Sequence, residues 1–246
     1  MNSKLLKDIF TIAVMKAMPD LKRQPMVLLL IGLVSSLPLF FIVVYGANIG
    51  YGLIGAMVSS VSFIGLTAAI QDIAIDRYLK MREIIVAMPV QPVGYALGVA
   101  LAPLILATPS LVIFMSLALW TGGLTIMSLL STSIALILCW IATSSIGFLI
   151  STYLQKAPPF VLSNLSNILG LLLCFIPPVY YPEESLGILS PISAIFPTSN
   201  TVSLIRVYSG SLDLSLEATM ARWFVLIFTA AFFVALTAAK AKWREP

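Results

Sequence analysis

The feature that most constrains this chain is a series of apolar stretches, each long enough to cross a lipid bilayer. A bilayer core of roughly 30 Å takes about 20 helical residues. Six stretches of this kind lie near residues 26–45, 52–72, 93–119, 124–153, 159–180 and 220–240. With 60% hydrophobic residues, the chain has more apolar surface than a soluble fold of its size buries. The sequence therefore predicts an all-α membrane protein, folded as a single transmembrane domain over residues 1–246.

The basic residues are divided unevenly between the two sides of these stretches. Twelve of the fourteen fall in the N-terminal segment, the second and fourth connections and the tail, while Arg206 and Arg222 fall on the other side. Cytoplasmic loops carry the excess of Lys and Arg, so we expect a multi-pass protein of the cell (plasma) membrane with both termini in the cytoplasm. This topology accounts for the net charge of +4 and predicts no nucleic-acid partner.

Residues 1–23 have a pattern of their own. Apolar side chains recur there at helical spacing, and polar side chains take the other side. The apolar set is Leu5, Leu6, Ile9, Ile12 and Ala13, and the polar set is Lys4, Lys7, Asp8 and Thr11. This pattern indicates an amphipathic helix lying on membrane lipid; the alternative is a solvated basic flank. Because no signal-peptide core with a cleavage site is present, we expect the segment to be retained.

Several kinds of chemistry lack their usual residues. The chain has no His, which removes His-based triads and the common zinc motifs. It has no Gly-x-x-x-x-Gly-Lys-Ser/Thr loop to bind ATP phosphates, and its two cysteines, Cys139 and Cys174, are far apart in sequence. The interiors of the stretches hold essentially no acidic residue for a proton relay. We therefore expect no catalytic residue, no metal and no cofactor bound by this chain.

The segment 76–90, DRYLKMREIIVAMPV, concentrates charge in a chain of which only 10% is charged. If the segment is helical, Ile73, Arg77, Ile84 and Met88 share one face, and Asp76 and Glu83 lie on the next. A helix with both charges and apolar anchors suits docking into a groove on a cytoplasmic partner. The alternative is a juxtamembrane helix that lies on lipid headgroups.

This segment resembles the cytoplasmic loop of the permeases of type-2 ABC exporters. In that family an acidic-basic pair is followed by Gly-Thr-Leu-Glu, apolar residues and Thr-Pro. Asp76, Arg77, Glu83 and Pro89 match this pattern, whereas Lys80-Met81-Arg82 replaces Gly-Thr-Leu. The resemblance implies a coupling helix over 76–89 that contacts a separate ATP-binding subunit. Its contact residues would be Asp76, Arg77, Lys80, Arg82, Glu83 and Pro89.

A second match to the same family lies in the region 177–219, which we expect outside the cell. The family has an aromatic-aromatic-Pro, then Asn-Pro-Leu-Thr, then Leu-Arg; here Phe196 stands where Asn is common. The prolines interrupt any continuous helix, which predicts short re-entrant helices, and the resemblance implies an outer gate. The matching and neighbouring residues are Pro178, Tyr180, Tyr181, Pro182, Pro197, Thr198 and Arg206. The alternative is a plain belt of interfacial aromatic residues.

Small and polar residues follow one face of the second and the fifth stretch. Gly55 and Ser59 are four residues apart, which allows another helix to approach closely. Ser163, Asn167 and Gly170 share a stripe beside Asn164, and Asn is costly against lipid. The family places these two spans at the dimer interface around the translocation route. The alternative is helix packing without substrate contact.

Together these features predict the permease subunit of an ABC exporter that moves an amphipathic substrate outward, such as a lipid, a glycolipid or polysaccharide, or a drug. ATP and Mg would be bound by a separate ABC subunit, and a second permease copy would complete a homodimer or heterodimer. A non-transporting scaffold or assembly factor is the main alternative. A membrane-embedded lipid enzyme is less favoured, because Glu183, Glu184 and Arg206 fit no known nucleophile or metal pattern.

Overall fold

The computed structural model describes residues 3–23, 49–78, 92–154 and 156–240, and these residues form helices and turns with no strand. Within these described residues, four segments are long and apolar enough to cross a membrane: Ile49–Tyr78, Leu97–Trp120, Ile126–Tyr153 and Leu216–Lys240. Four of the predicted stretches, 52–72, 93–119, 124–153 and 220–240, are thereby confirmed as membrane-length apolar helices. The predicted stretch 26–45 lies outside the described residues.

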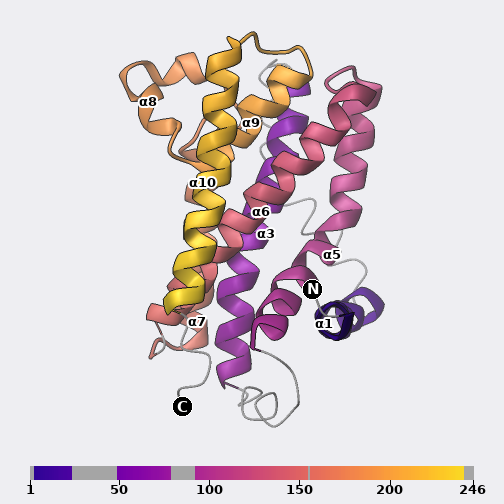
Figure 1. Ribbon diagram of the computed structural model, residues 1–246, viewed down its shortest axis with the longest axis vertical. Coiled ribbons are helices and arrows are strands. Elements are labelled where there is room, and N and C mark those ends of the chain that lie inside the picture. Colours follow the sequence, from indigo (N-terminus) through magenta and orange to yellow (C-terminus); the bar gives the residue numbers. More distant parts are fainter. Residues whose placement is uncertain (1–2, 24–48, 79–91, 155, 241–246) are drawn as a thin grey trace.

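The long helices lie roughly side by side and alternate in direction (Figure 1). They are α3 (Ile49–Tyr78), α5 (Pro92–Trp120), α6 (Leu129–Tyr153) and α10 (Leu216–Lys240). A shorter helix, α7 (Pro159–Phe175), lies among them. In the view of Figure 1, α3, α6 and α10 run downward, whereas α5 and α7 run upward. The C-terminal ends of α3, α6 and α10 therefore lie at one end of the molecule.

Helix α3 is the centre of the fold, and it packs against α5, α6, α7 and α9. Small residues allow its close approach to α6. A Cβ atom added at Gly147 of α6 would lie 2.6 Å from the carbonyl oxygen of Leu66, and one added at Gly65 would lie 2.8 Å from Thr143 Oγ1. A larger side chain at Gly147 would press on the backbone of α3, and one at Gly65 would force the side chains of α6 to move.

Helix α7 is shorter than the predicted fifth stretch, 159–180. It begins with Pro159 at its first position, where the missing N–H needs no partner. It ends at Phe175, and residues 176–181 are not helical, because Pro177 and Pro178 cannot continue a helix. Seventeen residues make a helix of about 25 Å, less than the roughly 30 Å of a bilayer core.

The region between α7 and α10 contains short helices separated by turns. They are the 3-10 helix η2 (Glu183–Leu189), α8 (Ser190–Ser193) and α9 (Pro197–Tyr208). Every residue of α9 from Pro197 to Arg206 is buried, although many of them are polar, because α9 packs against α3, α6 and α10. In Figure 1, η2 and α8 project beside the upper end of α10.

The N-terminal helix, α1 (Ser3–Arg23), lies across the long helices rather than along them (Figure 1). It packs on α5, and a Cβ atom at Gly98 would lie 2.7 Å from the Cβ atom of Ile12. Ala13 and Ala17 are buried, whereas Leu6 and Phe10 are exposed. One apolar face is therefore used inside the protein, and further apolar side chains point outward.

Candidate functional site

A polar seam runs between α3 and α7, near the end of the molecule where α3 finishes. The side-chain amide of Gln71 on α3 donates to Ser166 Oγ over 2.9 Å and approaches Asn167 Oδ1 at 3.4 Å, both on α7. Ser166 in turn donates to the Ser163 carbonyl over 2.7 Å. Ser166 is buried between the two apolar helices, where an unpaired polar group would be costly.

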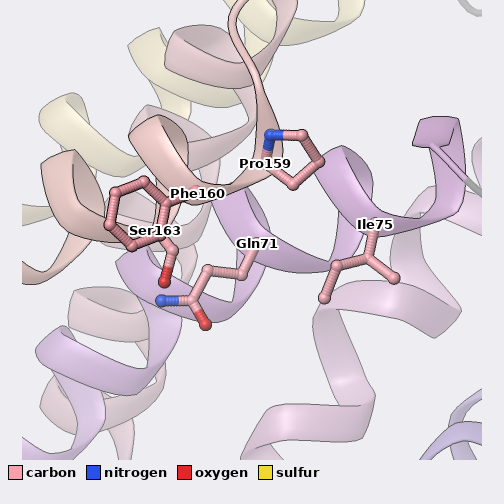
Figure 2. Close-up of a pocket in the computed structure, with 5 residues that line it drawn as sticks. All are labelled: Gln71, Ile75, Pro159, Phe160 and Ser163. Atoms are coloured by element: carbon pink, nitrogen blue, oxygen red, sulfur yellow. The ribbon is translucent and has the colours of Figure 1, made fainter.

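A hollow of about 230 Å³ opens at this seam (Figure 2). Its lining is Gln71, Ile75, Pro159, Phe160 and Ser163. Figure 2 shows the Gln71 amide and the Ser163 hydroxyl close to the ring of Phe160. None of these five side chains carries a formal charge, so the hollow offers one amide and one hydroxyl in an otherwise apolar wall.

The six residues predicted for a pathway or dimer interface fall into two groups. Gly55, Ser59 and Gly170 are buried within this chain. A Cβ atom at Gly170 would lie 2.6 Å from the ring of Phe63, so this glycine serves the contact between α7 and α3. The second group is less buried. Ser163 is half-buried in the lining of the hollow, and Asn164 and Asn167 are exposed on α7.

The residues predicted to couple to an ATP-binding subunit are described only at their start. Lys80, Arg82, Glu83 and Pro89 lie outside the described residues. Arg77 belongs to the last turn of α3 and donates to the Ser151 carbonyl of α6 over 2.9 Å.

Asp76, the other described member of this set, is buried with two partners. Lys16 on α1 donates to its carboxylate over 2.6 Å, and the hydroxyl of Tyr95 on α5 donates to the same oxygen. The end of α3 is therefore tied to α1, α5 and, through Arg77, α6.

The predicted gate residues lie together beyond the end of α7. Tyr180 is buried against Gly55 of α3, where a Cβ atom would lie 2.6 Å from its ring, and it stacks on Phe175 with ring centroids 5.8 Å apart. Tyr181 is half-buried and donates its hydroxyl to the Ile176 carbonyl over 2.8 Å. Thr198, at the start of α9, donates to the Leu173 carbonyl of α7 over 3.0 Å. Two of the seven predicted residues, Tyr180 and Thr198, thus make contacts that join the end of α7 to α3 and α9.

Arg206 organises the turn after α7. Its guanidinium is buried and donates to the carbonyl oxygens of Val179 at 2.9 Å, Tyr181 at 3.2 Å and Pro178 at 3.4 Å. It also lies 4.0 Å from the centroid of the Tyr51 ring, a cation–π contact. Carbonyl groups that the prolines leave without helical partners are thereby satisfied.

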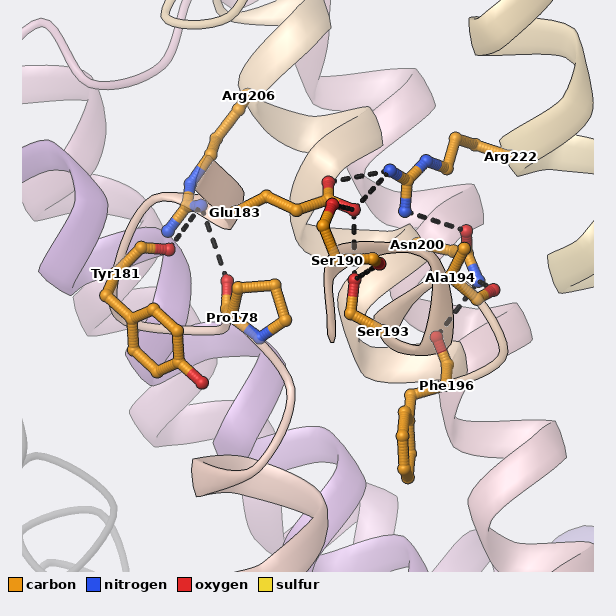
Figure 3. A network of polar contacts seen from close by, with 10 residues as sticks. All are labelled: Pro178, Tyr181, Glu183, Ser190, Ser193, Ala194, Phe196, Asn200, Arg206 and Arg222. Carbon is orange, nitrogen blue, oxygen red and sulfur yellow. Dashed lines mark hydrogen bonds and ion pairs between the residues drawn. The ribbon is translucent and has the colours of Figure 1, made fainter. Parts of the chain in front are cut away.

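A second polar network lies beside Arg206 (Figure 3). Arg222 on α10 pairs with Glu183 at 2.6 Å, and the hydroxyls of Ser193 and Ser190 donate to the same carboxylate over 2.9 and 3.2 Å. Arg222 also approaches Asn200 Oδ1 at 3.4 Å. Glu183 is thus an ion-pair partner of Arg222, and this pair fastens η2 and α8 to α10.

Four residues with clear roles were not predicted: Gln71, Lys16, Tyr95 and Arg222. Gln71 gave a signal, since an amide in an apolar helix requires a partner. The other three lie far in sequence from their partners, and no local spacing connects them.

Comparison with known proteins does not assign this chain: no protein-family model matches it, and no curated protein matches it. The fold nevertheless defines its general class, an all-helical protein with four membrane-length apolar helices in the part of the chain that the structure describes.

Proposed function

We propose that this chain is the permease subunit of an ABC exporter, which moves an amphipathic substrate such as a lipid, a glycolipid or polysaccharide, or a drug, out of the cell. The observation that carries the proposal is the polar seam of α3 and α7, with its uncharged hollow lined by Gln71 and Ser163. The hollow combines hydrogen-bonding groups with Phe160 and Ile75. Such a lining suits a molecule with an apolar body and a polar, uncharged head.

The source of energy would be a separate subunit, because the sequence has no phosphate-binding loop. That subunit would bind ATP and Mg and would contact the segment 76–89, which begins in the last turn of α3. Because α3 also forms one side of the seam, a displacement of the end of α3 by that subunit would change the shape of the hollow. ATP must then favour one of two packings that bind the substrate differently.

A second copy would complete the pathway, either as a homodimer or as a heterodimer. The exposed side of α7 supports this step, since Asn164 and Asn167 lie there beside Ile168 and Leu171. Exposed amide groups are costly against lipid, whereas a facing helix can supply hydrogen-bond partners. The substrate would then move along the α3–α7 seam of each copy.

The turn after α7 would be the outer gate, with α9 as a re-entrant helix. Tyr180 wedged on Gly55 closes the space between α3 and the end of α7, and Arg206 fixes the turn that carries it. Non-helical backbone at membrane depth is tolerated where protein covers it, which agrees with the burial of α9.

The test is to express the chain with candidate ABC ATP-binding subunits from the same cell, to purify any complex that forms, and to measure ATP hydrolysis and ATP-dependent flux of labelled lipid in liposomes. Gln71→Leu should reduce flux about tenfold, as the loss of one hydrogen bond to substrate predicts, while ATP hydrolysis continues. Thr229→Val is the control, because it removes a hydroxyl that bonds only within α10. Failure to bind any ATP-binding subunit would favour a scaffold, and wild-type flux in Gln71→Leu would refute the role of the seam.

A further inference from the structure

The buried carboxylate of Asp76 joins three helices that are otherwise packed in pairs. It is 8% exposed, and it receives Lys16 Nζ from α1 at 2.6 Å together with the hydroxyl of Tyr95 from α5. We call Lys16, Asp76 and Tyr95 the α1–α3 joint.

The main packing partner of α1 is α5 rather than α3. The contact of Ile12 with Gly98 sets a close approach between α1 and α5. Helix α5 packs in turn on α3 through the cluster of Ala69, Val99 and Phe148. The ion pair of Lys16 with Asp76 is a polar link, among the described residues, that ties α1 directly to the end of α3.

The residue next to Asp76 ties the same turn to another helix. Arg77 donates to the carbonyl and the hydroxyl of Ser151 on α6, over 2.9 and 3.4 Å. Two adjacent residues of opposite charge thus hold the last turn of α3 between the α1–α5 pair on one side and α6 on the other.

We infer that the α1–α3 joint passes movement of the end of α3 to α1 and α5, so that Lys16 and Tyr95 are positioning residues for coupling. This inference rests on the proposed function, in which an ATP-driven partner acts at the end of α3. An ion pair suits this task, because salt bridges between packed elements hold those elements in one arrangement and repack when the elements move to another.

The structural arm of the test measures the distance between spin labels on α1 and α3. The labels are placed at Thr11→Cys and Tyr78→Cys, both exposed positions, in the full chain with Cys139→Ala and Cys174→Ala. Lys16→Met should widen the distance distribution, Tyr95→Phe should widen it less, and Lys16→Arg should keep it narrow. Lys7→Met is the matched control, since Lys7 is an exposed lysine of the same helix.

The functional arm uses the complex with the ATP-binding subunit in liposomes. In Lys16→Met, substrate moved per ATP should fall about fivefold, the lower end of ordinary coupling energies, while ATP hydrolysis continues; Lys16→Arg should restore it. An unchanged label distance in both Lys16→Met and Tyr95→Phe would overturn the joint. A wider distance with unchanged coupling would overturn its role in transmission. If the wild-type chain shows no ATP-linked flux, the proposed function fails, and the distance measurement still decides whether the joint exists.

Discussion

At the scale of single residues, a few contacts restrict the backbone conformation of the turn after α7. Gly55 admits the ring of Tyr180 against the backbone of α3, and Arg206 gathers three carbonyl groups around one guanidinium. Arg suits this position because its planar fork directs several donors at once, whereas Lys presents a point charge. Both residues fix the backbone that positions Tyr180.

Replacement of Gly55 by Ala tests this contact. The added Cβ atom would lie 2.6 Å from the Tyr180 ring and 2.9 Å from the Val179 carbonyl oxygen, so the turn must shift. We expect the free energy of unfolding to fall by about 1–3 kcal/mol, as is typical of overpacking, with a lower Tm in detergent.

A double variant, Gly55→Ala with Tyr180→Ala, is the control for that experiment. Removing the ring relieves the larger of the two clashes, so the combined loss of stability should be smaller than the sum of the two single losses. Additive losses would show that the ring does not occupy the space above Gly55.

At the scale of elements, α7 and α9 together form an interrupted structure. Helix α7 ends after 17 residues, α9 begins beside its last turns through the bond from Thr198 to Leu173, and η2 with α8 projects between them. The pair of Glu183 with Arg222 fastens this projection to α10. The four-residue α8 is too short to be stable alone, so its place depends on such tertiary contacts.

The Glu183 carboxyl makes this attachment sensitive to pH. Burial by itself would raise the pKa of Glu183, but hydrogen bonding and charge from Arg222, with the hydroxyls of Ser193 and Ser190, hold that pKa below its ordinary value. A carboxyl whose folded-state pKa is lowered stabilises the fold above its unfolded pKa of about 4.3, and this contribution is lost as pH falls through the folded pKa.

We therefore expect Glu183→Gln to lower the Tm at pH 7, and the difference from wild type to shrink as pH is lowered below about 4.3. Thermal unfolding in detergent between pH 7 and pH 3 measures this effect. Ser185→Ala in the same turn is the control, because the Ser185 side chain is exposed and the hydroxyls that bond to Glu183 are those of Ser190 and Ser193. A difference that stays constant over the whole range would contradict the assigned ionisation.

At the scale of the whole molecule, α3 connects the two ends to which our proposal assigns the outer gate and the contact with the ATP-binding subunit. Its first half packs on Tyr180 and the buried α9, its second half forms the seam with α7, and its last turn carries the joint with α1. A movement at one end of such a central, buried helix must be met by repacking along its length. This continuity supports our proposal, in which movement at the end of α3 acts on the seam.

Cysteine labelling tests the overall arrangement in cells. In a Cys139→Ala, Cys174→Ala background, single cysteines at exposed Thr121 and Ser185 should react with an impermeant maleimide from outside, whereas those at exposed Thr11, Lys156 and Lys240 should not. Labelling of Thr121 and Lys156 from the same side would contradict the alternation of the helices. The fully inverted pattern would keep the alternation and contradict the expected orientation.

The sequence predicted the elements better than the contacts. Four apolar helices were predictable because a bilayer-length run of apolar residues has few other stable structures. The fifth stretch was predicted with the correct start, at Pro159, but with an end that is too late. The apolar pattern continues to Tyr180, whereas Pro177 and Pro178 end the helix at Phe175. Gly55 was predicted as a close-approach position and Gly170 as part of a polar stripe at a pathway or dimer interface. Both glycines contact side chains of the same chain, Tyr180 and Phe63.

By itself, therefore, the sequence determined the class of protein and the length and rough position of its apolar helices, because these follow from local composition and from backbone hydrogen bonding in lipid. Only the tertiary structure decided that Lys16 meets Asp76 and that Arg222 meets Glu183. The tertiary structure also brought Gln71 of α3 into contact with Ser166 of α7. These pairs lie tens of residues apart, and their formation depends on how helices rotate and pack against one another, which hydrophobic periodicity does not specify.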